Sequence, residues 1–229
     1  LQDAILKFID NNTNDEENFQ CVLQKIDEQN IKNEVNEFRS LLHLINNISN
    51  FHIRSSHFFP KIEKILFHIK DDFSKFLTQH EIYNIFKKNK RITLFLVQNN
   101  IIGFQSHFIN NLQCLEHKKF PHYFINYISK SITEKYHLQI MNECGDYNDE
   151  KFKKNQKIGE NENDYCQIIR DDLIDEFITY VNKTELSLRK KIKPSIFETN
   201  SFLESQKVSL IEYASFFGSI QIFKYLYKN

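Results

Sequence analysis

The sequence predicts an all-α protein in which a helical N-terminal domain precedes helix–turn–helix repeats. The 229 residues include only 4 Gly and 3 Pro, too few for a chain of many short strands and tight turns. Apolar residues recur at helical spacing in most segments of the chain. Residues 209–227 form the clearest such segment, because two short apolar-periodic stretches meet there at a single glycine, Gly218.

Residues 1–141 are predicted to form the helical N-terminal domain. Thr78 and Glu81 are spaced as a capping box, in which each residue satisfies a free backbone N–H of the helix start. Asn89 lies between two apolar-periodic segments, where we expect a left-handed turn. Residues 78–97 therefore indicate a helix pair. The expected helices cover residues 1–9, 19–26, 35–48, 60–69, 71–77, 78–86, 92–97, 104–112 and 121–136.

A change of composition marks the predicted domain boundary. Residues 142–163 are rich in Asn, Glu and Lys and contain half of the glycines of the chain, so we expect a polar linker there. Two helix pairs are predicted in residues 164–229. Aligning Phe177 with Phe223 also aligns Ile168 with Ala214. The segment between the pairs contains Pro194, which we expect to begin a helix.

In the final helix pair, several positions have the residue type that the predicted geometry requires. Ser209 and Glu212 form a further capping box, and Gly218 suits a left-handed helix end because it has no Cβ to clash. Ala214 is small enough to let the two helices approach. The predicted repeat frame consists of Ser209, Glu212, Ala214, Gly218, Phe223 and Leu226.

This pattern resembles the helical part of an ankyrin repeat. Ser209 stands at the Thr of that motif, Ala214 at its first Ala and Gly218 at its Gly, whereas Leu210 replaces its Pro and Glu212 its His. The chain as a whole is similar to ankyrin-type proteins of unknown function that are expanded in parasitic protists, with an all-helical region before the repeats. The stretches that support this resemblance are residues 48–52, 59–66, 85–92, 196–198, 208–214 and 217–218.

The resemblance implies a non-catalytic protein–protein interaction scaffold with an unidentified protein partner. The four cysteines form no CxxC pair, which favours free thiols and a cytoplasmic location. We expect no cofactor, no small-molecule substrate and no membrane insertion. The 30 basic and 30 acidic residues balance, so the composition does not favour a nucleic-acid partner. Cys114, His117 and His122 lack a fourth zinc ligand at motif spacing. We expect a buried thiol beside surface histidines.

Two alternatives remain open from the sequence. In the first, the chain is a regulatory or targeting region of a larger enzyme. In the second, it is a weak nucleic-acid binder through two basic clusters, Lys87–Arg91 and Arg189–Lys193. We expect both clusters to be solvated turns. Because the chain begins at Leu1 and stops where a repeat ends, we also expect part of a longer protein, with an exposed apolar face on its last helix pair.

Overall fold

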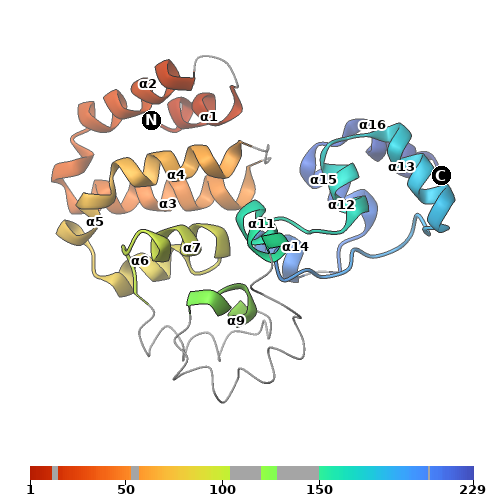
Figure 1. The fold of residues 1–229 in the computed structure, drawn as a ribbon. Helices are drawn as coiled ribbons and strands as arrows, with labels where there is room; N and C mark the ends of the chain where they lie inside the picture. The colour runs from red at the N-terminus through yellow and green to blue at the C-terminus, as the bar shows by residue number, and fades with distance from the viewer. Residues whose placement is uncertain (12–14, 53–56, 104–119, 128–149, 206) are drawn as a thin grey trace. The chain divides into compact units, whose positions relative to one another are not determined.

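The computed structural model describes residues 1–11, 15–52, 57–103, 120–127, 150–205 and 207–229 (Figure 1). Every regular element in these ranges is helical, apart from one isolated antiparallel bridge between Lys191 and Ser209. The all-α prediction is therefore confirmed. The chain divides into two compact units, Leu1–Gly103 and Phe104–Asn229.

The first unit stacks three helix pairs. Its elements are α1 (Gln2–Asp10), α2 (Asp15–Glu28), η1 (Ile31–Asn33), α3 (Val35–Phe51), α4 (Phe58–His68), α5 (Lys70–Phe76), α6 (Gln79–Phe86) and α7 (Lys90–Gln98). Helix α1 packs against α2 and α4, α3 packs against α4 and α6, and α7 packs against α4 and α6. Figure 1 shows the resulting layers, α1–α2, then α3–α4, then α6–α7.

The turn between α6 and α7 differs from the prediction. The capping box at its start is confirmed, because the Thr78 N–H donates to Glu81 Oε2 at 2.9 Å and Glu81 N–H donates to Thr78 Oγ1. Asn89, however, is extended (φ −114°) rather than left-handed, and its side chain accepts a hydrogen bond from the Ile92 N–H. A three-residue turn beginning with right-handed Lys87 reverses the chain, which leaves Asn89 to cap α7.

The first basic cluster is half buried, which corrects the solvated-turn prediction. Lys90 is 1% exposed and Arg91 is 3% exposed. The Arg91 Nη2 atom lies 2.5 Å from Glu63 Oε1, and the guanidinium carbon lies 5.8 Å from the centre of the Phe59 ring. The first turn of α7 packs into the core of the unit, so its charges need buried partners. Of this cluster, only Lys87 and Lys88 remain available to an external anion.

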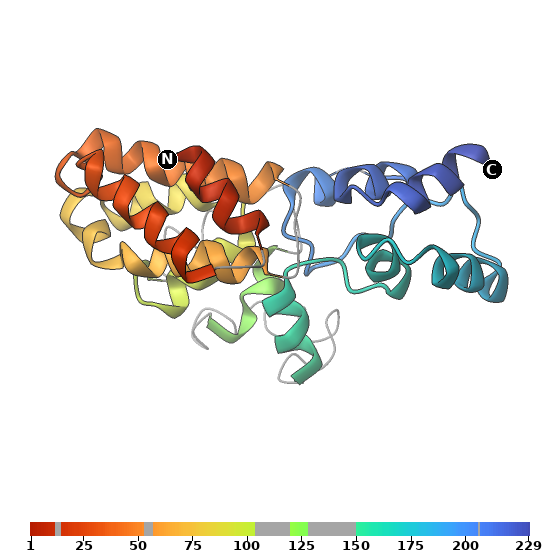
Figure 2. The same cartoon turned by 90° about the horizontal axis from the view of Figure 1, so that it is seen from above.

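The second unit contains short helices separated by irregular segments. They are α9 (Phe120–Tyr123), η2 (Ile125–Tyr127), α11 (Glu150–Ile158), α12 (Asp164–Arg170), α13 (Ile174–Thr184), α14 (Ser201–Ser205), α15 (Leu210–Phe217) and α16 (Ile220–Lys228). Helices α15 and α16 form one layer, and α12 and α13 form the layer next to it (Figure 2).

The stretch predicted as a polar linker is partly helical. Helix α11 lies within residues 142–163 and buries Phe152 and Gln156. The Phe152 ring lies 5.0 Å from that of Phe197, and the Tyr123 hydroxyl donates to the Gln156 carbonyl at 2.7 Å. Two anchoring side chains one helical turn apart hold this otherwise polar helix against its neighbours. The division between the units falls at Gly103, earlier than the sequence placed it.

Pro194 does not begin a helix, which corrects another prediction. Residues 192–200 are irregular, and α14 begins at Ser201. Side chains satisfy the backbone of this segment in place of helical hydrogen bonds. Ser195 Oγ accepts a hydrogen bond from the Phe197 N–H at 2.9 Å, and Asn161 Nδ2 donates to the Lys193 carbonyl at 2.9 Å. Three predicted features lie outside the described residues: the helix over 104–112, Cys114 and His117. Residues 128–136 of the helix predicted over 121–136 lie outside them as well.

The ion pair of Arg91 and Glu63 is expected to be a major stabilising contact of the first unit. Arg91→Met should lower the free energy of unfolding by about 3 kcal/mol, because it leaves the Glu63 carboxylate without its buried partner. Urea denaturation followed by circular dichroism measures this loss. The matched control is Lys25→Met, in the exposed pair with Glu28, which should cost less than about 0.5 kcal/mol. Equal losses in the two variants would contradict the prediction.

Candidate interaction surface

Two helix pairs in the second unit share one backbone register. The first helices begin at Asp164 and Leu210, and the second helices begin at Ile174 and Ile220, so both starts are 46 residues apart (164 to 210 and 174 to 220). The first helix of each pair is also followed by a left-handed residue at the same offset, Asp172 (φ 51°) or Gly218 (φ 69°).

The hydrogen bonds of the two turns are equivalent. The Leu173 N–H donates to the Ile168 carbonyl at 3.1 Å, and the Ser219 N–H donates to the Ala214 carbonyl at 2.9 Å. Both are the long hydrogen bond of a Schellman motif, which satisfies a free carbonyl at a helix end. The predicted alignment of Ile168 with Ala214 is therefore confirmed at the level of the backbone.

The predicted geometry at the start and end of α15 is confirmed. The Ser209 N–H donates to Glu212 Oε2 at 2.7 Å, and the Glu212 N–H donates to Ser209 Oγ at 3.4 Å. Hydrogen bonds from the Ser209 side chain and backbone lower the pKa of Glu212. Ala214 is fully buried, and Gly218 occupies the left-handed position that favours glycine.

The turn of the first pair caps the second helix of the second pair. The Asp172 carboxylate accepts hydrogen bonds from the Gln221 N–H at 3.1 Å and from the Ile222 N–H at 3.0 Å. These are two of the N–H groups that a helix start leaves free, and a carboxylate there also interacts favourably with the helix dipole. In addition, the Ser219 hydroxyl donates to the Ile169 carbonyl at the end of α12. The two pairs are therefore joined through their turns.

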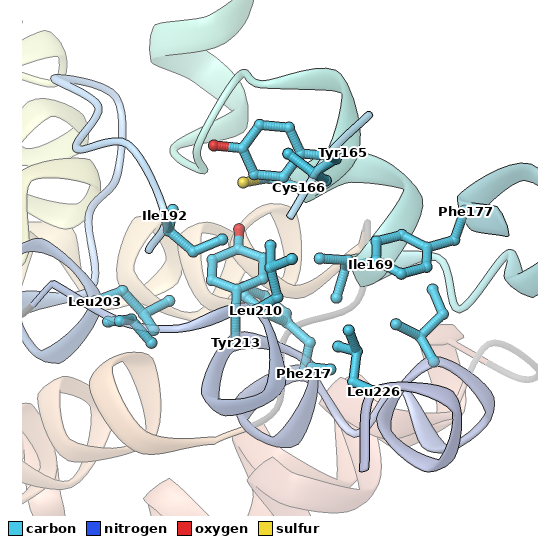
Figure 3. Close-up of a cluster of buried hydrophobic side chains, with 14 residues drawn as sticks. Tyr165, Cys166, Ile169, Phe177, Ile192, Leu203, Leu210, Tyr213, Phe217 and Leu226 are labelled. Atoms are coloured by element: carbon cyan, nitrogen blue, oxygen red, sulfur yellow. The ribbon is translucent and has the colours of Figure 1, made fainter. Parts of the chain in front are cut away.

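A buried polar contact joins α12 and α15 beneath these turns. Arg170 Nη1 donates to Tyr213 Oη and to the Asn161 carbonyl, each at 2.8 Å. Figure 3 shows Tyr213 and Phe217 from α15 among the side chains of α12, including Cys166. Burial raises the pKa of the Cys166 thiol and that of the Tyr213 hydroxyl. Both groups stay protonated at neutral pH, so Cys166 is poorly suited to act as a nucleophile.

The described residues do not assemble a metal centre. No cluster of three or more His, Cys, Asp or Glu side chains suited to a metal occurs among them. His122, predicted to lie on the surface, is buried. The second basic cluster differs from the first, because Arg189, Lys190, Lys191 and Lys193 are all exposed. The solvated-turn prediction holds for this cluster.

Helix α16 has an exposed apolar face, as expected for this helix pair. Ile220 is 60% exposed, Phe223 is 36% exposed and Tyr227 is 77% exposed. Their spacing of three and four residues places them on one side of the helix. The rings of Phe223 and Tyr227 stack with their centres 6.3 Å apart and an interplanar angle of 11°. We call Ile220, Phe223 and Tyr227 the α16 outer face.

The opposite side of α16 faces the core, where Ile222 and Leu226 are buried. Leu226 therefore occupies the core position predicted for the repeat frame, and Phe223 does not. The physical reason is the rotation of α16 about its axis. Asp172 receives the N–H groups of the first turn, and this contact directs Ile222 inward and Phe223 outward.

The positions of the α16 outer face are covered in the first helix pair. At the same 46-residue offset they correspond to Ile174, Phe177 and Val181 on α13. Phe177 is fully buried, and its ring lies 6.1 Å from that of Tyr225 on α16. Ile174 and Val181 pack against the same core. In the first pair these positions pack against the core that the two pairs share, whereas on α16 they are open.

Removal of the Asp172 cap should loosen α16. Asp172→Gly keeps a residue suited to the left-handed conformation and deletes the carboxylate, so it should lower the free energy of unfolding by about 1 kcal/mol. Hydrogen exchange should show the Gln221 and Ile222 amides exchanging about fivefold faster. Asp171→Asn, at the exposed neighbouring carboxylate, is the control and should change neither measurement. Unchanged exchange in Asp172→Gly would contradict the capping role.

Cys166 should resist alkylation in the folded protein. Native protein treated with iodoacetamide at pH 8 should be labelled at exposed Cys21 and not at buried Cys166, as measured by peptide mass spectrometry. In urea both should be labelled. Rapid labelling of native Cys166 would contradict the buried placement.

The same burial predicts a loss of stability at alkaline pH. The folded thiol keeps its proton as the pH rises above 9.0, the ordinary pKa, whereas the unfolded thiol loses it. The unfolded state then binds fewer protons, so the free energy of unfolding should fall by up to about 1.4 kcal/mol per pH unit. Denaturation of wild type and Cys166→Ala between pH 8 and 10.5 measures this contribution. The variant should show the shallower decline, and equal slopes would contradict it.

No described helix is long and apolar enough to span a membrane. Comparison with protein-family models, with curated proteins and with solved structures finds no match to this chain.

Proposed function

We propose that this chain is a non-catalytic protein–protein interaction scaffold, built in residues 164–229 from two divergent ankyrin-like helix pairs. The observation that supports it best is the α16 outer face, where three apolar side chains are open at positions that are covered on α13. Exposed apolar surface next to polar surroundings is typical of protein interaction sites. Helix-pair repeats bind partners through surfaces of this kind.

The relation between the pairs supports the repeat interpretation. They share their turn hydrogen bonds and their left-handed residues, and the first pair caps the second. Their 46-residue separation exceeds the ankyrin period of about 33 residues, and the excess lies between α13 and α15, where α14 is inserted. Insertions between repeats map to one face of such an array.

We also propose a cytoplasmic location. Cys21 and Cys166 are free thiols, which is typical of proteins in reducing compartments. The nucleic-acid alternative has less support than the scaffold. Lys90 and Arg91 are buried, so the exposed cluster Arg189–Lys193 would have to supply most of the phosphate contacts.

Affinity capture tests the scaffold function. The full 229-residue chain, immobilised at one end, is exposed to native lysate with and without nuclease, and bound proteins are identified by mass spectrometry. We expect a reproducible protein partner whose capture survives nuclease and moderate salt. The matched control is the chain with Arg189, Lys190, Lys191 and Lys193 changed to Gln, which should capture that partner equally well. Capture that nuclease or this variant abolishes would instead favour the nucleic-acid alternative.

A further inference from the structure

We propose that the α16 outer face binds an amphipathic helix of another protein that has acidic side chains beside its apolar stripe. This inference rests on the proposed scaffold function and identifies the chemistry of the partner. It follows from the apolar stripe, the charges beside that stripe and the covered counterpart on α13.

The apolar stripe has the form of a helix-docking site. Ile220, Phe223 and Tyr227 follow one another at helical spacing, so they extend along the axis of α16 rather than forming an isolated spot. The Phe223 and Tyr227 rings stack on each other, which holds two aromatic groups in a single exposed unit. Aromatic side chains of this kind are frequent anchors in protein interfaces. A partner helix would complement the stripe with its own apolar residues at spacings of three and four.

The charge that α16 itself places beside the stripe has one sign. Lys224 follows Ile220 by four residues and Lys228 follows Lys224 by four, so both lie along the same side of the outer face. Both are exposed, and α16 contains no acidic residue. A helix with Glu or Asp next to its apolar stripe would therefore meet complementary charge. A partner with Lys or Arg in those positions would meet like charge.

The equivalent apolar positions on α13 are covered. They pack against the core of the second unit, with Phe177 against Tyr225 of α16. The covering pair also receives the Asp172 cap, but the position equivalent to Asp172 in the second pair is Gly218, which has no side chain. The outer face therefore offers apolar and cationic contacts without a carboxylate to fix the start of a following pair. This combination favours a separate helix that has its own caps.

A second copy of the chain is a poor occupant of this face. Pairing two α16 outer faces would bring two copies of Lys224 and Lys228 close together. With no acidic residue on α16 to compensate, this juxtaposition is repulsive. The charge pattern therefore favours a different, acidic partner.

Two synthetic stapled helices provide the probe. Both have Leu at positions i, i+3, i+4 and i+7, and they differ only in having Glu or Lys at the positions beside the Leu stripe. Binding to the full chain is measured by fluorescence anisotropy. We expect saturable binding of the Glu peptide and at least about tenfold weaker binding of the Lys peptide. Lys224→Glu combined with Lys228→Glu should reverse this preference.

Substitutions at the aromatic groups locate the contact. Phe223→Ala should weaken binding of the Glu peptide by about tenfold or more. The matched control is Phe67→Ala, because Phe67 is a 50% exposed phenylalanine on α4, and it should leave binding unchanged. Circular dichroism checks that each variant is folded. Tyr227→Ala, at the most exposed member of the face, provides a second test should Phe223→Ala lose helical structure.

Several results would overturn this inference. They are no saturable binding of the Glu peptide, equal binding by Phe223→Ala, self-association that depends on Phe223, and Phe223-dependent binding to vesicles of phosphatidylserine and phosphatidylcholine. The scaffold function can survive such a result. A partner captured from lysate that binds wild type and Phe223→Ala equally would leave the scaffold standing and place its binding surface elsewhere.

Discussion

The second unit depends on the contact by which one helix pair caps the next. Asp172 adopts the left-handed conformation at the end of its own turn and accepts the first N–H groups of α16. Ser219 returns a hydrogen bond to the end of α12. Because successive helix residues are about 100° apart, a shift of one residue in this contact would turn a different side of α16 toward the core. The cap therefore determines both the buried side, with Ile222, and the open side, with Phe223.

The first unit uses buried charge for a comparable purpose. The Lys61 ammonium donates to the Phe8 carbonyl at 3.0 Å and to the Asn11 carbonyl, and it lies 2.9 Å from Asp15 Oδ1. It thus joins the end of α1 to the start of α2 from a position on α4. A cation is favourable beside the free carbonyls of a helix end. Charges in this unit fix the junctions of neighbouring pairs, and an apolar side chain of the same size would leave those carbonyls unsatisfied.

Features set by local geometry could be predicted from the sequence. The capping box at Ser209 and the left-handed turn at Gly218 depend on residues within one or two helical turns of each other, so their spacing is sufficient evidence. Asn89 is extended instead of left-handed, because its side chain caps α7 by accepting a hydrogen bond from the Ile92 N–H. The exposure of Lys90 and Phe223 could not be predicted, because it depends on helices distant in sequence. The alignment of the two helix pairs was the sequence feature that came closest to locating the exposed face.

That alignment shows why an exposed apolar position in a helix pair is difficult to recognise from one pair alone. Phe177 and Phe223 occupy the same register position, follow equivalent turns and have the same chemistry, yet one is fully buried and the other is exposed. The difference in exposure arises from the neighbouring helix and not from the side chain, since α16 covers Phe177. An apolar residue at this position therefore does not by itself reveal whether another helix of the chain covers it. Lys224 and Lys228 distinguish the open position from the α13 face, because they place positive charge beside it that the proposed partner would complement with negative charge.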